Sequence, residues 1–499
     1  MLLGAAAGLP LRMPDATASD AIKPDERSAE APVLTFLGAT RTVTGSRFLI
    51  DTATTRVLVD CGLYQGIKEL RQRNWAPFPV EPSTIDAVVL THAHIDHTGY
   101  VPVLTSRGYA GPIFASEQTA ALAGIVLPDS GHLQEEEARY ANLRGFSKHK
   151  PALPLYTEQD ARQSLGQFRT LAFGEPCEVA TGVRATLQPA GHILGSSILT
   201  LELETGPRQD GAARPRRIVF SGDLGRTGHP ILAAPHTLGD ADVVVVESTY
   251  GNRSHDDAGS LDALAKAITR TAARGGVVVI PAFAVDRTEV LLVHLKALRD
   301  AGAIPTLPIY VDSPMALAAL AVYRRAIREH GPEIRPDVSD EGDPFDLGNI
   351  REIRDVSESM ELDRLTAPAI IVSASGMATG GRVLHHLARY LPDHRSTVIM
   401  VGFQAEQTRG RQLADGARQV KLLGKYVQVR AEVVDLPAFS VHADREGLLE
   451  WLATAERDPD VCYVVHGEPA AAEHLSTAIA DRLGWTAVVP TYGERVRLD

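Results

Sequence analysis

The sequence predicts an α/β protein of two to three domains in which short apolar strands carry polar groups at their ends. Three observations support this fold class. The 499 residues exceed what a single ordinary core holds. Runs rich in β-branched residues alternate with helical patterns along the chain. Histidine or acidic side chains follow several of the apolar runs directly, and functional residues of layered α/β folds collect at such strand ends.

The composition is that of a soluble globular protein, with 44% hydrophobic and 22% charged residues. No run reaches the roughly 18 apolar residues that span a bilayer, and no basic residue precedes the apolar start, so neither a membrane partner nor a secretory signal is predicted. The three cysteines lie far apart in the sequence, at Cys61, Cys177 and Cys462. They favour a reducing cytoplasm over a disulfide framework.

The net charge of −12, from 50 Lys and Arg against 62 Asp and Glu, disfavours a protein that coats nucleic acid with its whole surface. The charge is uneven, however, because residues 382–430 hold nine basic residues against three acidic ones. A solvated helix face explains such a run as well as a nucleic-acid contact does. Overall charge therefore leaves the class of partner open.

The sequence pattern predicts mainly strands in the first half of the chain. Strands are expected at residues 33–37, 48–51, 56–60, 113–115, 184–188, 198–203, 218–220 and 243–246. Helices are expected at 117–126 and 157–171, with a helical surface insertion at 133–150 between them.

The pattern changes near Asn252. Helices at 261–273, 288–298 and 316–329 are interleaved with strands at 277–280, 309–311, 370–373 and 398–401, which predicts a parallel sheet covered by helices. Residues 331–348 are acidic and rich in Gly and Pro, so a loop is expected there. This region is predicted to form a second α/β domain.

The stretch LTHAHIDHTGY, residues 90–100, carries His92, His94, Asp96 and His97 directly after an apolar run. Such nitrogen and oxygen ligands suit a borderline cation such as Zn²⁺. In an extended or turning segment these side chains cannot all reach one atom, so two neighbouring metal positions are expected. The alternative is a solvated histidine-rich loop or a local acid–base network.

Further ligand types stand at later strand ends: His192 in PAGHILGSS, Asp223 in IVFSGDLG and His466 in VCYVVHGE. Each alone is as compatible with a structural or turn residue. Together they predict one metal held by His92, His94, His192 and Asp223, and a second held by Asp96, His97, Asp223 and His466, with Asp223 bridging. The expected metals are two Zn²⁺, although Mn²⁺ would also be accepted less tightly. Asp60, at the end of VLVDCG, either orients a ligand histidine by a hydrogen bond or caps a turn.

The glycine-rich stretch SASGMATGGR, residues 373–382, precedes an expected helix at 383–390. Backbone N–H groups at such a turn can hold a phosphate. Ser375, Gly376, Gly380, Gly381 and Arg382 are therefore candidate phosphate contacts. The alternative is a helix entrance that binds no ligand.

With these motifs the chain resembles the metallo-β-lactamase superfamily and, within it, the β-CASP nucleases, from Val33 onward. The superfamily signature is matched by Asp60, the 92–97 cluster, His192 and Asp223. The β-CASP branch adds an acidic residue, matched by Glu247 in ESTYG, and two histidines, matched by His442 in FSVHAD and His466 in VHGE. The resemblance implies an αββα metallo-β-lactamase sandwich with an inserted α/β β-CASP domain. The implied divisions are a flexible tail at 1–32, sandwich parts at 33–251 and 439–499, and the insertion at 252–438.

In that family a histidine at the position of His466 accompanies RNA-processing members. The chain looks like bacterial and archaeal relatives of the cleavage and polyadenylation endonuclease. It is expected to be less similar to ribonuclease J, since no counterpart of that family's C-terminal domain is expected after Asp499, and the N-terminal KH modules of archaeal relatives are not expected either. The resemblance implies a zinc-dependent ribonuclease acting on single-stranded RNA, in RNA processing or decay.

The implied mechanism is attack by a hydroxide bound between two metals, with Asp96 and Asp223 at the metals. His442, held protonated by Glu247, would be the general acid, giving 5′-phosphate and 3′-hydroxyl products. Aromatic residues make up only 5% of the chain, which predicts weak sequence preference. A small-molecule hydrolase of the same fold, a DNA nuclease and a non-catalytic scaffold are the alternatives. The sequence leaves endo- or exonucleolytic mode and a homodimer open.

Overall fold

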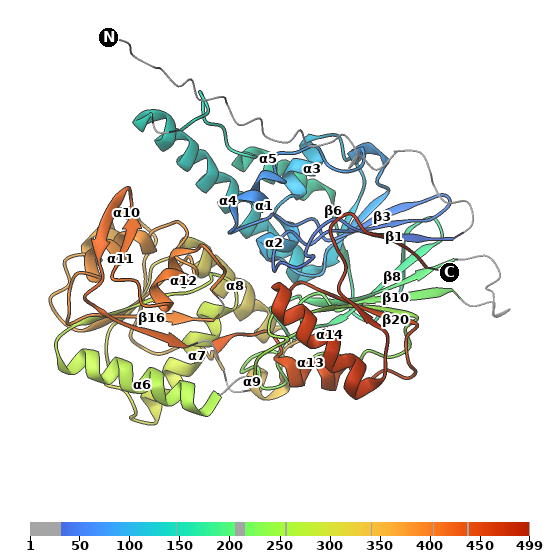
Figure 1. The fold of residues 1–499 in the computed structure, drawn as a ribbon. Helices are drawn as coiled ribbons and strands as arrows, with labels where there is room; N and C mark the ends of the chain where they lie inside the picture. Colours follow the sequence, from blue (N-terminus) through green and yellow to red (C-terminus); the bar gives the residue numbers. More distant parts are fainter. Residues whose placement is uncertain are drawn as a thin grey trace, which may run out of the picture.

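Two seven-stranded sheets lie face to face in one lobe of the protein (Figure 1). The computed structural model describes residues 31–145, 147–204, 215–254, 257–340, 342–402, 404–436 and 439–498, so nearly all of the predicted tail, 1–32, lies outside it. In order across the first sheet, the strands are β22 (Arg495–Arg497), β1 (Val33–Phe36), β2 (Phe48–Asp51), β3 (Arg56–Val59), β4 (Ala87–Val89), β5 (Ile113–Ser116) and β6 (Phe168–Leu171). Across the second they are β21 (Ala487–Val488), β20 (Val461–Val465), β11 (Val243–Glu247), β10 (Arg216–Phe220), β9 (Ser197–Leu203), β8 (Val183–Pro189) and β7 (Cys177–Ala180).

The two sheets enclose an apolar core because alternate side chains of each strand point inward. In β2, Phe48 and Ile50 face the second sheet, whereas Leu49 faces the opposite way, toward helices. Phe48 meets Phe220 across the sandwich with ring centroids 5.6 Å apart. Strands that are apolar on both faces, such as β4 and β11, are thus buried on both sides.

Helices cover the outer faces of both sheets, which confirms the predicted αββα layer order. On the first sheet these are α1 (Lys68–Gln72), α2 (Ile95–Thr98), α3 (Val101–Ser106), α4 (Glu117–Arg144) and α5 (Glu158–Ser164); on the second they are α13 (Arg445–Leu452) and α14 (Pro469–Leu483). Within the described ranges, no helix is both long and apolar enough to cross a membrane.

The second lobe (Figure 1, yellow-green to orange) is built on a six-stranded sheet in which every strand pair is parallel. Its strands, in spatial order, are β14 (Ile350–Glu352), β13 (Ile309–Val311), β15 (Ala369–Ser373), β12 (Val277–Pro281), β16 (Thr397–Val401) and β19 (Glu432–Leu436). One face packs on α6 (Asp257–Ala273), α7 (Arg287–Asp300) and α8 (Pro314–Arg328). The other packs on α10 (Val356–Leu362), α11 (Val383–Tyr390), α12 (Arg409–Ala414) and the hairpin of β17 (Gln419–Leu422) and β18 (Lys425–Gln428).

This lobe is an insertion into the sandwich. The chain leaves the second sheet after β11 and returns to it in β20, which pairs in parallel with β11 from Val243–Val461 to Glu247–Val465. The insertion confirms the predicted architecture, while the boundaries at 252 and 438 stay a prediction. The two lobes share one apolar cluster, in which Leu122 and Val126 of α4 pack with residues of α7 and α8.

Three local predictions were wrong. Residues 168–171 were expected to be helical, but they form β6 because Phe168 to Leu171 pair in parallel with β5. The stretch at 133–150 is helical as far as Arg144, as predicted, but it continues α4 instead of forming a separate insertion, and Gly145 caps the helix in a left-handed conformation, φ 67°. The expected loop at 331–348 contains the short helix α9 (Pro336–Asp340).

Candidate metal centre and active site

The histidine-rich stretch is a turn between β4 and α2. His92 and His94 precede the helix, whereas Asp96 and His97 lie in its first turn. Because the backbone changes direction at His94, the two pairs of side chains project differently. This geometry agrees with the expectation that the four groups cannot all serve one cation.

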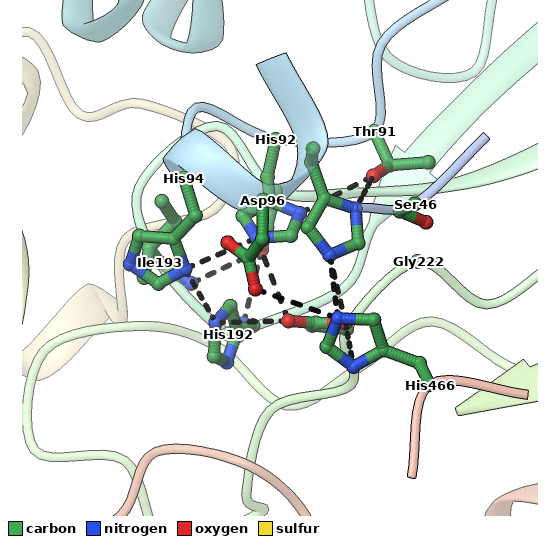
Figure 2. Close-up of polar contacts among 12 residues, drawn as sticks. Ser46, Thr91, His92, His94, Asp96, His192, Ile193, Gly222 and His466 are labelled. Atoms are coloured by element: carbon green, nitrogen blue, oxygen red, sulfur yellow. Dashed lines mark hydrogen bonds and ion pairs between the residues drawn. The ribbon is translucent and has the colours of Figure 1, made fainter. Parts of the chain in front are cut away.

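The first ligand group brings together His92, His94 and His192, which lie close together in Figure 2, and one oxygen of Asp223. Nδ1 of His94 lies 3.1 Å from Nε2 of His92 and 3.3 Å from Nε2 of His192. Oδ2 of Asp223 lies 3.5 Å from Nε2 of His92 and 3.7 Å from Nε2 of His192. Four donor atoms from three separate segments thus converge on one point.

The second group comprises Asp96, His97 and His466. Nε2 of His97 lies 3.1 Å from Nε2 of His466, which in turn lies 3.5 Å from Oδ2 of Asp96. Figure 2 shows His466 pointing toward Asp96 from the end of a strand remote in sequence. His466 adopts φ 50°, a left-handed conformation that turns the chain directly after β20.

Asp223 stands between the two groups. Its Oδ2 faces the first group, while Oδ1 lies 3.4 Å from both His97 Nε2 and His466 Nδ1. Burial alone would raise the pKa of this carboxyl, but His466, His97 and His92 outweigh burial and hold it well below its usual range. A buried, ionised carboxylate with its two oxygens turned to different histidine sets is placed to bridge two cations.

The donor set fits metal ions. Burial lowers the pKa of His92 and His192 well below the usual histidine value and that of His94 to about 4. These imidazoles are therefore neutral, with lone pairs at hydrogen-bonding distance from one another. Lone pairs this close repel one another, and a cation between them would remove the repulsion by accepting them as ligands. Neutral imidazole is the form that binds metal.

Asp60 contacts the second group through His97, on the ring nitrogen that faces away from Asp223. Its Oδ2 lies 2.7 Å from Nδ1 of His97, and its Oδ1 accepts a 2.8 Å hydrogen bond from the backbone N–H of Thr91. This contact fixes His97 with Nε2 toward Asp223. Burial lowers the pKa of His97, but Asp223 and Asp60 together raise it well above the usual value.

His442 and Glu247 form a pair at the edge of the cluster. Nδ1 of His442 lies 3.1 Å from Oε1 of Glu247 and 3.9 Å from Oδ2 of Asp223. Glu247 is held in turn by the backbone N–H of Leu224 at 2.7 Å. Burial lowers the pKa of His442, but Glu247 and Asp223 together outweigh burial, so the net shift of this pKa is upward. This pair can therefore keep a proton beside the metal centre.

The glycine-rich turn adjoins the centre through Phe283, whose ring lies 6.4 Å from that of His94. A Cβ on Gly376 would stand 2.6 Å from the Phe283 ring, so only glycine fits there. Gly380, Gly381 and Ser375 lie along the same turn, and Ser375 Oγ is 2.9 Å from Thr379 Oγ1.

Arg382 has protein partners instead of a free guanidinium. Its Nη1 lies 2.7 Å from Oδ1 of buried Asp312, and its Nη2 donates to the backbone oxygen of Arg354 at 2.8 Å. Phosphate binding by the turn stays a prediction, and Arg382 is its weakest member.

Asp286 and Arg287, which follow β12 and lie in the contact between the lobes, belong to none of the sequence motifs described above. Both are buried. A signal was present, because the two residues follow an apolar strand closely, as Asp60 and Asp223 do. This signal is weak, because the intervening PAFAV is itself apolar.

Three family models match successive parts of the chain. The beta-lactamase superfamily domain matches residues 55–280, the Beta-Casp domain residues 288–413, and the Zn-dependent metallo-hydrolase RNA specificity domain residues 426–490.

Similar proteins match most of the chain. It is 34% identical over 460 residues to ribonuclease TTHA0252 of Thermus thermophilus, covering 92% of this chain and 98% of that protein. It is 30% identical over 490 residues to transcription termination factor FttA of Pyrococcus abyssi, covering 93% and 71%. A crystal structure of a protein of unknown function from Enterococcus faecalis V583 aligns with a TM-score of 0.52 at 14% identity, over 94% of this chain and 100% of that one, which shows a shared fold.

Proposed function

Because the chain belongs to the β-CASP family of RNA nucleases with the metallo-β-lactamase fold, we propose that it is a zinc-dependent ribonuclease that cleaves single-stranded RNA at a dinuclear centre. One observation carries the proposal. The two oxygens of Asp223 are shared between two histidine groups, and the His442–Glu247 pair stands 3.9 Å from the same carboxylate.

Two zinc ions at these groups would supply an activated water and neutralise negative charge on the phosphate oxygens. His92, His94, His192 and Asp223 would hold one ion. Asp96, His97, His466 and Asp223 would hold the other. Asp60 orients His97 by its 2.7 Å contact, which keeps the Nε2 lone pair directed at the centre.

His442 is the proposed proton donor to the leaving sugar oxygen. Its Nδ1 faces Glu247 at 3.1 Å, so the proton available for transfer is on Nε2. The carboxylates of Glu247 and Asp223 stabilise the protonated imidazole despite its burial. Protonation of a 3′-oxygen leaves a 3′-hydroxyl on one product and a 5′-phosphate on the other.

RNA is favoured as substrate by the RNA specificity domain model over residues 426–490, which contains His442 and His466. The relative matched over nearly its whole length is named a ribonuclease, which supports RNA processing or decay. The three cysteines are unpaired in the structure, in keeping with a reducing cytoplasm.

The test uses the purified 499-residue protein with end-labelled single-stranded RNA and DNA of the same sequence, with and without a chelator. Chelator-sensitive cleavage of RNA, with 5′-phosphate ends and little DNA cleavage, is expected. Asp223→Asn is the matched inactive control. Equal cleavage of DNA would favour the DNA nuclease, and turnover of nitrocefin or a thioester without RNA cleavage would favour a small-molecule hydrolase.

A further inference from the structure

Arg287 carries a buried guanidinium without a hydrogen bond to two of its nitrogens. The side chain is only 5% exposed, and in the described part of the chain Nε and Nη1 contact no acceptor. Buried arginines are normally paired, and a guanidinium has five donors to satisfy. An unpaired one is therefore a costly feature that calls for an explanation.

The position of Arg287 is close to the proposed general acid. It is the first residue of α7, four residues after Phe283, whose ring lies near that of His94. Its charge acts on both His442 and Tyr250, whose rings lie 6.1 Å apart. The guanidinium also packs against the backbone of Gly402, since a Cβ on that glycine would lie 3.1 Å from the guanidinium carbon.

A second positively charged side chain, Arg226, lies near Arg287. Arg226 is near enough to act on the charge of Arg287, and its Nη1 donates to the backbone oxygen of Ser440 at 3.3 Å. Burial lowers the pKa of Arg287 first, and Arg226 lowers it further. Two neighbouring guanidinium groups beside His442 favour a negatively charged ligand between or above them.

Asp286, the acidic residue that precedes Arg287 in the chain, does not pair with it. Asp286 is fully buried, but its Oδ1 accepts a 2.6 Å hydrogen bond from Tyr323 and its Oδ2 lies 3.2 Å from Nε2 of His229. Its charge favours the charged form of Arg287 without a hydrogen bond between the two. The N–H groups on Nε and Nη1 of Arg287 therefore stay available to donate hydrogen bonds to a ligand.

We propose that Arg287 binds a backbone phosphate of the RNA on the leaving-group side of the scissile bond. This inference rests on the proposed ribonuclease function and adds a substrate contact to it. His442 marks the side of the leaving 3′-oxygen, and that oxygen belongs to the nucleotide upstream of the cut. The phosphate in reach of Arg287 is therefore the one 5′ to the scissile phosphate.

The first experiment pairs an altered residue with an altered phosphate. A short RNA cut at one bond is made with a neutral methylphosphonate at each phosphate in turn, and kcat/KM is measured for the parent protein and for Arg287→Met. Loss of one charge-assisted contact is expected to lower kcat/KM about 10- to 100-fold. In the parent the loss occurs with the methylphosphonate 5′ to the cut, and in Arg287→Met that modification adds little more.

The second experiment does not depend on turnover. RNA binding by the chelator-treated protein is measured by fluorescence anisotropy over a range of salt concentrations, together with the thermal unfolding temperature. Arg287→Met is expected to weaken binding and to flatten the slope of log K against log salt by about 0.7, as for one lost phosphate contact on a single strand. Its unfolding temperature is expected to equal or exceed that of the parent, because a buried unpaired charge is removed.

Arg328→Met, an exposed arginine at the end of α8, is the matched control for lost charge, and parent-like cleavage and binding are expected of it. Additive effects of Arg287→Met and the upstream methylphosphonate would overturn the inference, as would a marked fall in unfolding temperature, which indicates a structural role. If the parent protein cleaves no RNA, the proposed function fails. If it cleaves RNA and Arg287→Met does so equally well, only the role of Arg287 fails.

Discussion

Tyr323 and Asp286 are joined by a buried 2.6 Å hydrogen bond, which belongs to a network that reaches the loop of His192. The same tyrosine hydroxyl accepts a 2.9 Å hydrogen bond from the backbone N–H of Leu194, two residues after His192. Tyr323 belongs to α8 of the inserted lobe, so one side chain ties that lobe to the loop that carries a proposed metal ligand. His229 completes the network on the other oxygen of Asp286.

Tyr323→Phe should therefore destabilise the protein by about 1–3 kcal/mol, because Leu194 N–H and Asp286 each lose a buried partner. Urea denaturation of the metal-free protein measures this change. Tyr310→Phe is the matched control, since no described hydrogen bond involves the Tyr310 hydroxyl, and it is expected to change stability by less than about 0.5 kcal/mol. Equal effects of the two substitutions would show that the network adds no stability.

Asp223→Ala should remove both metal ions, whereas His192→Ala should weaken only one site. The difference follows from the Asp223 oxygens, which lie 3.5 Å from His92 Nε2 in one group and 3.4 Å from His97 Nε2 in the other. Zinc per chain, measured by inductively coupled plasma mass spectrometry after dialysis, tests both variants. An Asp223→Ala protein that keeps two zinc ions would exclude this residue as the bridge.

Asp60→Asn should lower the affinity for one zinc ion about 10- to 100-fold and leave the fold intact. The amide keeps the shape of the carboxylate but loses the charge that supports His97. Competition with a fluorescent zinc chelator gives the two affinities separately. Unchanged affinities would mean that Asp60 serves only to hold Thr91 in the turn.

His442→Ala should retain both metals yet lower turnover by roughly 10²- to 10⁴-fold, because it removes the proton donor. The acid works only when protonated, so turnover should fall as pH rises through the elevated pKa of His442. In Glu247→Gln the charge that raises this pKa is gone, and the fall should begin at lower pH. If the alkaline limb of the pH–rate profile lies at the same pH in Glu247→Gln as in the parent protein, Glu247 does not set the pKa of the general acid.

Much of the fold was predictable because the strands are short, apolar and regular. Strand 48–51 and helix 383–390 were predicted with the bounds that the structure gives. Residues 168–171 could not be placed from local pattern, since their strand form depends on pairing with β5, 52 or more residues earlier in the chain. Non-local pairing of this kind leaves little trace in a short sequence window.

The convergence of the candidate ligands was predictable because each one follows a strand or lies in a motif. The sequence did not reveal the partners that decide which groups are available to a ligand. The sequence suggests Arg382 as a phosphate contact, but in the structure its guanidinium is paired with Asp312, 70 residues away in the chain. Arg287 had no motif of its own, and its unpaired state is visible only once Asp286 is seen to be occupied by Tyr323 and His229.

Glu333, buried where the lobes meet, should make stability depend on pH. The residue is 3% exposed, and in the described part of the chain no donor meets either carboxyl oxygen in full hydrogen-bonding geometry, although the backbone N–H groups of Gly195 and Glu333 lie close enough to act on it. Burial raises its pKa to about 7, an effect that the nearby backbone N–H of Gly195 only partly offsets. The folded protein therefore holds this proton more tightly than the unfolded chain, whose carboxyl has a pKa of 4.5.

For a carboxyl whose pKa is raised on folding, stability is complete below the unfolded pKa and falls as pH rises toward the folded pKa. The loss at Glu333 should amount to roughly 3 kcal/mol between about pH 4 and about pH 8. Glu333→Gln keeps the shape without the titration, so its free energy of unfolding relative to the parent should rise by that amount across the range. Urea denaturation at several pH values measures the difference, with exposed Glu329→Gln as control. A constant difference between Glu333→Gln and the parent would mean that Glu333 ionises alike in both states.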